Sequence, residues 1–80
     1  MIIMEETLLD LEPGVQGTVA RFAGTPGFMR KLRTIGIREG KTLVVVARHP
    51  LGGPVVVEVD GREVTLGRGM AERVIVDVTT

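Results

Sequence analysis

The residues of this chain that could do chemistry are few, and their types favour binding over catalysis. The sequence contains neither Ser nor Cys, the side chains that most often act as nucleophiles. His49 is its one histidine, so a relay that needs a second imidazole cannot be built. Its neighbouring carboxylates, such as Glu5 beside Glu6, are predicted to lie in solvent rather than in the apolar surroundings that a general acid requires. The sequence therefore predicts a protein that is not an enzyme.

Sites for a metal ion, a phosphate group or a cofactor are not expected either. His49 precedes Pro50 in a loop and has no second ligand at a recognised spacing. Met29 and Met70 fall at core-like positions, where packing is the usual role of methionine. The glycine-rich stretches lack the Walker lysine and the strand-to-helix context of a dinucleotide loop, so they are interpreted as turns. We expect no metal site and no cofactor.

A short helix is predicted directly after Gly24. Thr25 can cap its N-terminus, and Pro26 suits its first turn. Its apolar stripe has helical spacing and consists of Phe28, Met29, Leu32 and Ile35. Gly36 stands where a left-handed residue commonly closes a helix.

The opposite side of this predicted helix is basic and contains no acid. Its cations are Arg30, Lys31 and Arg33. One interpretation is a solvated face whose charges favour the C-terminal end of the helix. The other is a docking patch for an acidic partner, which the loop over residues 49–54 could extend, because loops on rigid scaffolds often bind partners. The hypothetical partner-binding set is Arg30, Lys31, Arg33, Arg48, His49 and Leu51.

Length and composition predict one domain spanning residues 1–80, because a chain of 80 residues with 44% apolar side chains supplies a single core. Ten basic and ten acidic residues cancel, yet acids dominate residues 1–20 and cations dominate residues 21–48. Such a charge split can orient a protein against a charged partner. The lack of cysteine agrees with a reducing cytosol. The longest apolar run, residues 43–47, is far shorter than the roughly 20 residues that cross a membrane, so any membrane role would be indirect.

The first half of the chain also predicts three strands. We expect a short strand or extended arm over Thr7–Leu11, followed by a turn at Glu12–Gly14. A second strand is expected over Val15–Phe22, with a bend or bulge at Gly17. Lys41–Arg48 is apolar through its middle, which predicts a central strand covered on both faces.

A hairpin is the clearest local unit of the second half. Val55–Val59 and Arg62–Leu66 flank the turn dipeptide Asp60-Gly61. Counting outward from the turn places the apolar residues on one face and sets Glu58 opposite Glu63 on the other.

One helical turn over Gly67–Arg73 and a last strand from Val74 to Val78 are expected to follow. Together the elements predict an all-β fold: a small, strongly bent barrel of five to six strands with one short inserted α-helix.

Small barrels often bind nucleic acid. Barrels that hold single strands stack the bases on aromatic rings, whereas this chain offers only Phe22 and Phe28. Its net charge is zero. We therefore expect no nucleic acid as partner, although a small nucleic-acid-binding or repressor-associated barrel stays as the alternative. Self-association is a third option.

A series of short motifs runs in a definite order along the chain. They are Leu9, Leu11, Gly14, Gly17 and Val19; Arg30, Lys31 and Leu32; Ile35-Gly36-Ile37-Arg38-Glu39-Gly40; Pro50-Leu51-Gly52-Gly53-Pro54; Gly61; and Leu66, Ala71, Val74 and Val76. In this order and spacing, the chain resembles the FeoA family of ferrous-iron transport accessory proteins over nearly its whole length.

The resemblance implies a fold, a partner and a compartment. The fold would be an SH3-like barrel with an inserted helix. The partner would be the FeoB membrane transporter, through its cytoplasmic GTP-binding domain, so that contact with the membrane would run only through the transporter. The protein would be cytoplasmic. A related barrel forms the C-terminal domain of iron-dependent repressors of the diphtheria-toxin-repressor type, which is the source of the alternative above.

Overall fold

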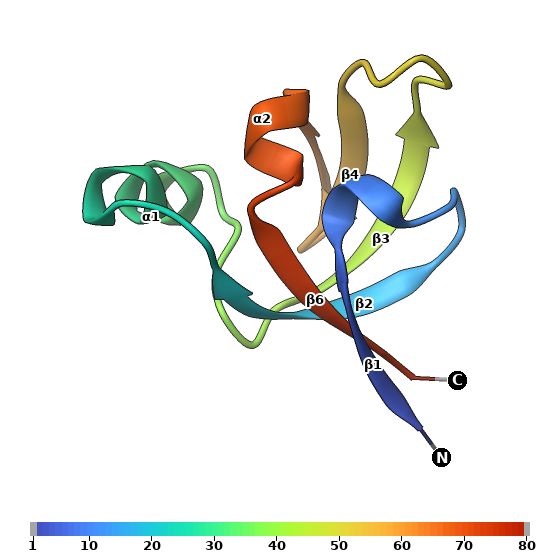
Figure 1. Ribbon diagram of the computed structural model, residues 1–80, viewed down its shortest axis with the longest axis horizontal. Helices are drawn as coiled ribbons and strands as arrows, with labels where there is room; N and C mark the ends of the chain where they lie inside the picture. Colours follow the sequence, from blue (N-terminus) through green and yellow to red (C-terminus); the bar gives the residue numbers. More distant parts are fainter. Residues whose placement is uncertain (1, 80) are drawn as a thin grey trace.

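Six antiparallel strands form the body of the computed structural model, which describes residues 2–79 (Figure 1). In chain order the elements are β1 (Ile3–Thr7), η1 (Leu8–Asp10), β2 (Gln16–Phe22), α1 (Pro26–Thr34), β3 (Thr42–Arg48), β4 (Val55–Val59), β5 (Arg62–Leu66), α2 (Arg68–Ala71) and β6 (Val74–Thr79). Here η1 denotes a short 3₁₀ helix. The predicted all-β fold with one short helix is confirmed.

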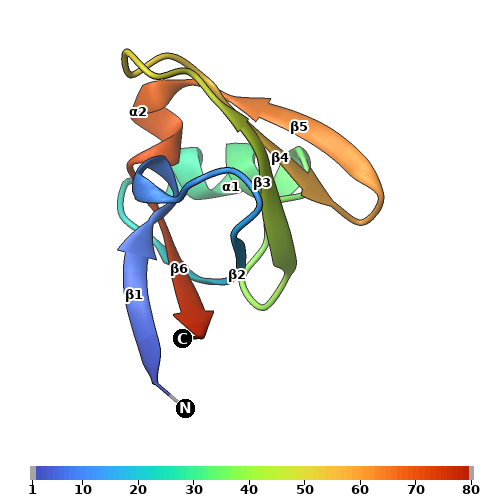
Figure 2. The ribbon, with the colours of Figure 1, turned by 90° about the vertical axis from the view of Figure 1, so that its right-hand side faces the viewer.

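The strands form one sheet in the order β1-β6-β2-β3-β4-β5. The register shifts between Val19 and Arg21 where β2 pairs with β6, and between Val45 and Ala47 where β3 pairs with β4. Such irregularities increase strand twist and bending. The bent sheet curves around its inner face, and Figure 2 shows β3, β4 and β5 to the right of β1 and β6.

The core is built only from apolar side chains, since no polar residue between positions 2 and 79 is buried. Its members are Leu8, Leu11, Val19, Phe22, Leu32, Ile37, Leu43, Val45, Val55, Val57, Val59, Leu66, Ala71, Val74, Val76 and Val78. Valines of β4 and β6 enter at every second position, as strands with one face inward require. The helix α1 and the strands β3 and β4, which carry or flank the candidate interaction residues, therefore pack against the same core.

The predicted hairpin is confirmed in every pair. Val55 faces Leu66, Glu58 faces Glu63 and Val59 faces Arg62, with the two intervening pairs in step. Asp60 and Gly61 both have positive φ, at 53° and 76°, which is the geometry of a two-residue type I′ turn.

The predicted helix is also confirmed. The side chain of Thr25 accepts a hydrogen bond from the Phe28 amide at 3.2 Å, and Pro26 opens α1. Leu32 is fully buried, and the rest of the apolar stripe packs partly against the core. Gly36 follows the helix with a φ of +99°. The predicted single turn after β5 is present as α2, and the predicted last strand as β6.

The first strand lies earlier than the sequence predicted. It spans Ile3–Thr7 and pairs with β6, whereas Thr7–Leu11 had been expected. The reason is the spacing of Leu8 and Leu11, which are both buried. Three residues apart, two side chains lie on opposite faces of a strand but on one side of a 3₁₀ turn, so η1 can bury both.

Two further expectations need correction. A bend or bulge is predicted at Gly17, but the bulge is not there, because Gly17 pairs in register with Leu43 and the register of β2 shifts between Val19 and Arg21. Gly17 marks a close approach instead, since a Cβ there would lie 3.3 Å from the Val76 side chain. The strand β3 is central, but it is not covered on both faces along its length, because Val46 is 42% exposed.

Candidate interaction surfaces

The first group of sequence-predicted residues lies on α1. The helix turns Leu32 into the core and leaves Arg30 and Lys31 exposed on its outer side. Among residues 2–79, no carboxylate lies within ion-pair distance of either cation. These two charges are therefore available to a partner.

Arg33, the third cation of α1, is already engaged. Its Nη2 lies 2.7 Å from Oε2 of Glu39, and its Nε donates to Oε1 of the same carboxylate at 3.2 Å. The hydrogen bond from Arg33 lowers the pKa of Glu39 below its ordinary value, and the same contact raises the pKa of Arg33. Both groups stay ionised at neutral pH, so the pair adds little net charge to the surface of α1.

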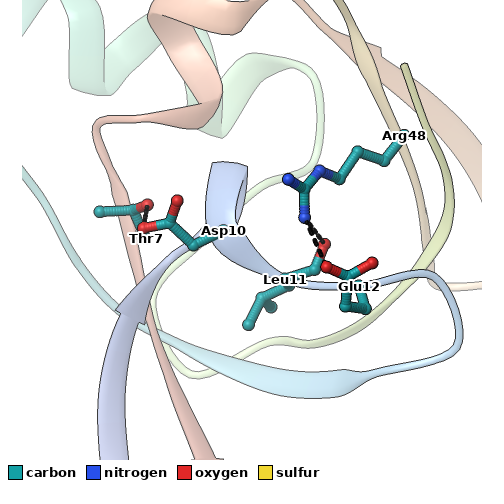
Figure 3. Close-up of polar contacts among 5 residues, drawn as sticks. All are labelled: Thr7, Asp10, Leu11, Glu12 and Arg48. Carbon is teal, nitrogen blue, oxygen red and sulfur yellow. Dashed lines mark hydrogen bonds and ion pairs between the residues drawn. The ribbon is translucent and has the colours of Figure 1, made fainter. Parts of the chain in front are cut away.

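Arg48, at the end of β3, braces the segment that follows η1 (Figure 3). Its Nη1 lies 3.1 Å from a carboxylate oxygen of Glu12 and 3.5 Å from the carbonyl oxygen of Leu11. On the other side of η1, the hydroxyl of Thr7 donates to Asp10 at 3.0 Å. The guanidinium of Arg48 is thus committed to its own chain and is not a free docking cation.

Folding pairs part of the acidic segment with the basic one. Glu5 of the acidic segment pairs with Arg21, and Glu12 pairs with Arg48. The hydrogen bond from Arg21 lowers the pKa of Glu5. Because these pairs join the acidic and basic segments, the basic character that remains depends on cations without a carboxylate neighbour.

His49 and Leu51 lie in the connection between β3 and β4. The His49 amide donates to the Pro54 carbonyl at 3.3 Å, and the Gly52 amide donates to the His49 carbonyl at 3.2 Å. The imidazole Nδ1 accepts from the Leu51 amide at 3.4 Å. The loop closes on itself through these bonds, and the Leu51 side chain is left 88% exposed.

The structure separates the predicted set into two groups. Figure 1 shows α1 on the left and the loop of residues 49–54 at the upper right, with α2 and the sheet between them. Arg30, Lys31 and Arg33 share the surface of α1, whereas Arg48, His49 and Leu51 lie at the loop. The two groups do not form one continuous patch.

One residue beside the loop was missed by the sequence reasoning. Arg68 opens α2, and its guanidinium lies against Gly52, where an added Cβ would come within 3.0 Å of Nη1. No signal in the sequence links positions 52 and 68. Their proximity follows from the way α2 and the β3–β4 loop meet at the same end of the sheet.

Between residues 2 and 79, no three His, Asp or Glu side chains gather as metal ligands would, and no pocket opens. No helix in the same range is long and apolar enough to cross a membrane.

A family model described as the FeoA domain matches residues 6–78. The chain belongs to the FeoA family.

Solved structures of FeoA proteins have the same SH3-like fold. A crystal structure of an iron uptake regulatory protein (FeoA) is 33% identical, has a TM-score of 0.86, and is matched over 94% of this chain and 100% of that one. A solution structure of FeoA from Chlorobium tepidum is 31% identical, with a TM-score of 0.82 over 94% of this chain and 71% of that one. The predicted SH3-like barrel is confirmed.

The same fold occurs inside a longer regulator. A manganese-dependent transcriptional repressor is 30% identical, with a TM-score of 0.87, and covers 99% of this chain. The match takes up 44% of the repressor, so this FeoA chain spans under half of that protein's length. No curated protein gives a significant match. FeoA is not a known enzyme family but a small accessory domain.

Proposed function

We propose that this FeoA protein is a cytoplasmic accessory protein of ferrous iron transport, which acts by binding the cytoplasmic GTP-binding domain of an FeoB-type transporter. The observation that carries the proposal is the FeoA family match over residues 6–78. The names of two similar solved structures, an iron uptake regulatory protein and an iron(II) transport protein A from Clostridium thermocellum, support the link to iron.

The proposed contact residues are those predicted from the sequence. Those that are already paired within the chain, Arg33 and Arg48, are expected to contribute less than the others. Arg30 and Lys31 have no carboxylate neighbour within residues 2–79, so they are the charges on α1 that a partner can use. Exposed charges at the rim of an interface mainly raise the association rate and its dependence on salt. Leu51 supplies exposed apolar area, which mainly slows dissociation once a contact has formed.

The test measures binding of this protein to the full-length transporter in lipid nanodiscs. Biolayer interferometry gives the association and dissociation rates. We expect saturable binding, and we expect the double charge reversal of Arg30 and Lys31 to Glu to lower the association rate at low salt. Ile3→Asp, at an exposed apolar position on β1, serves as control. Wild-type protein that fails to bind, together with normal growth of a deletion strain on scarce Fe(II), would refute the proposal.

The second candidate function is a nucleic-acid-binding or repressor-associated module. The likeness to the manganese-dependent transcriptional repressor favours it. Retention on DNA or RNA that weakens as salt rises would support this candidate, because phosphate contacts release counterions. Elution of the wild-type protein without retention at low salt would remove it.

A further inference from the structure

Leu51 is the most exposed of the large apolar side chains between residues 2 and 79, at 88%. An isolated apolar residue on a protein surface is common and by itself indicates nothing. The surroundings of Leu51 distinguish it, because the loop that carries it is held in one shape and has a free cation at its side.

The loop holds its shape through contacts that leave little freedom. Gly53 packs so closely on His49 that a Cβ at position 53 would lie 2.7 Å from the His49 Cβ. Gly52 has a φ of +78°, a conformation that other residues rarely adopt. Pro50 and Pro54 fix two further φ angles, and three hydrogen bonds close the loop. The backbone that carries Leu51 is therefore held in place before any partner arrives, which lowers the entropy cost of binding.

The charge next to Leu51 is positive. Arg68 is exposed and lies against Gly52, and within the described range no carboxylate reaches ion-pair distance of its guanidinium. Arg48, on the β3 side of the loop, is occupied by Glu12. The surface that a partner would contact thus consists of one exposed leucine with one guanidinium beside it that has no ion-pair partner within residues 2–79.

We propose that Leu51 and Arg68 form a docking knob for an apolar pocket on a protein partner, with a carboxylate at the rim of that pocket to bind Arg68. The knob would be the anchor of the transporter contact, so this inference rests on the proposed function. The charges of α1 then act at a distance from the anchor, because α1 lies on the other side of the molecule (Figure 1).

Other occupants fit the knob less well. A second copy placed symmetrically over Leu51 would bring two Arg68 guanidinium groups together, and like charges repel. A lipid surface needs a broader apolar face or a cluster of cations than one leucine and one arginine provide. A nucleic acid needs aromatic rings for stacking or several free cations, and neither accompanies Leu51.

The experiment measures binding of FeoA variants to the full-length transporter in nanodiscs. Leu51→Asp is expected to raise Kd by at least about tenfold, mainly through faster dissociation. Arg68→Glu is expected to raise Kd severalfold, whereas Arg68→Lys keeps the charge and retains most of the affinity. Ile3→Asp introduces the same change at an exposed apolar site of β1 and is expected to leave Kd within about twofold.

Thermal unfolding of each variant shows whether the fold is intact, and Leu51→Ala supplies a milder truncation if Leu51→Asp unfolds. Wild-type affinity retained by folded Leu51→Asp or Leu51→Ala would overturn the docking knob while leaving the proposed function in place. An equal loss in Ile3→Asp would also overturn it. Absence of binding by the wild-type protein would refute the proposed function, and this assignment with it.

Discussion

The helix α1 and the loop of residues 49–54 both present side chains to solvent, but they are fastened in opposite ways. The helix turns its leucine inward, so that Leu32 is fully buried and the outer side keeps the charges. The loop turns its leucine outward and is held by backbone hydrogen bonds and by the contact between Gly53 and His49. The difference shows that burial of Leu32 stabilises the helix, whereas backbone contacts stabilise the loop and the Leu51 side chain adds nothing to its stability.

The largest effect expected from this comparison is the contrast between two leucine truncations. Leu32→Ala removes a side chain with 0% exposure, so we expect it to lower the free energy of unfolding by about 2–5 kcal/mol. Leu51→Ala removes a side chain with 88% exposure and should change that free energy by no more than about 0.5 kcal/mol. Urea denaturation followed by circular dichroism measures both.

Equal costs for the two truncations would break the comparison. A large cost for Leu51→Ala would mean that the leucine of the loop packs against its own chain. A small cost for Leu32→Ala would mean that α1 is held by contacts other than its buried leucine.

A smaller effect is expected from two glycine substitutions, and the two have opposite signs. Gly53→Ala would place a Cβ 2.7 Å from the His49 Cβ, so the loop must shift, and we expect a loss of about 1–3 kcal/mol. Gly27→Ala, in the first turn of α1, meets no atom within 4 Å and should stabilise by about 0.4–1 kcal/mol. Amide spectra of Gly53→Ala should change around Leu51. A Gly53→Ala protein as stable as wild type would show that the loop yields easily and does not hold Leu51 in place.

Local rules account for the parts of the fold that the sequence predicted. The hairpin register follows from the Asp60-Gly61 turn and alternation alone, and the structure confirms each pair. The limits of α1 follow from the cap at Thr25 and the left-handed Gly36, which are signals within a few residues of the helix. No knowledge of distant contacts was needed in either case.

Tertiary contacts decide the parts that could not be predicted. The first strand is predicted too late, because the pairing of Ile3 with Thr79 cannot be recognised without the sheet. Arg48 is predicted to be a free cation, because Glu12, its partner in the folded protein, lies far from it along the chain. Arg68 is not predicted, because its place beside Gly52 depends on where α2 meets the loop. Contacts between residues far apart in sequence thus redistribute which charges are free, and the hypothetical binding set changed accordingly.

The smallest effect is the pH dependence of the ion pair between Arg33 and Glu39 at the end of α1. Arg33 lowers the pKa of Glu39, so the folded state holds that carboxyl's proton less tightly than the unfolded chain does. The resulting stabilisation is present above the ordinary pKa of glutamate, about 4.3, and is lost as the pH falls through the lowered value. Glu39→Gln should therefore be slightly less stable than wild type at pH 7, and this difference in stability should shrink as the pH falls through the lowered pKa of Glu39. Thermal unfolding of both proteins across this pH range measures the difference in stability, in which the effects of all other carboxylates cancel.

Because the pair is exposed, the difference in stability should also shrink at high salt. A difference in stability that stays unchanged once Glu39 is protonated would mean that Glu39 stabilises the end of α1 through something other than its charge. Arg33 would then have to be counted among the cations that α1 offers to a partner.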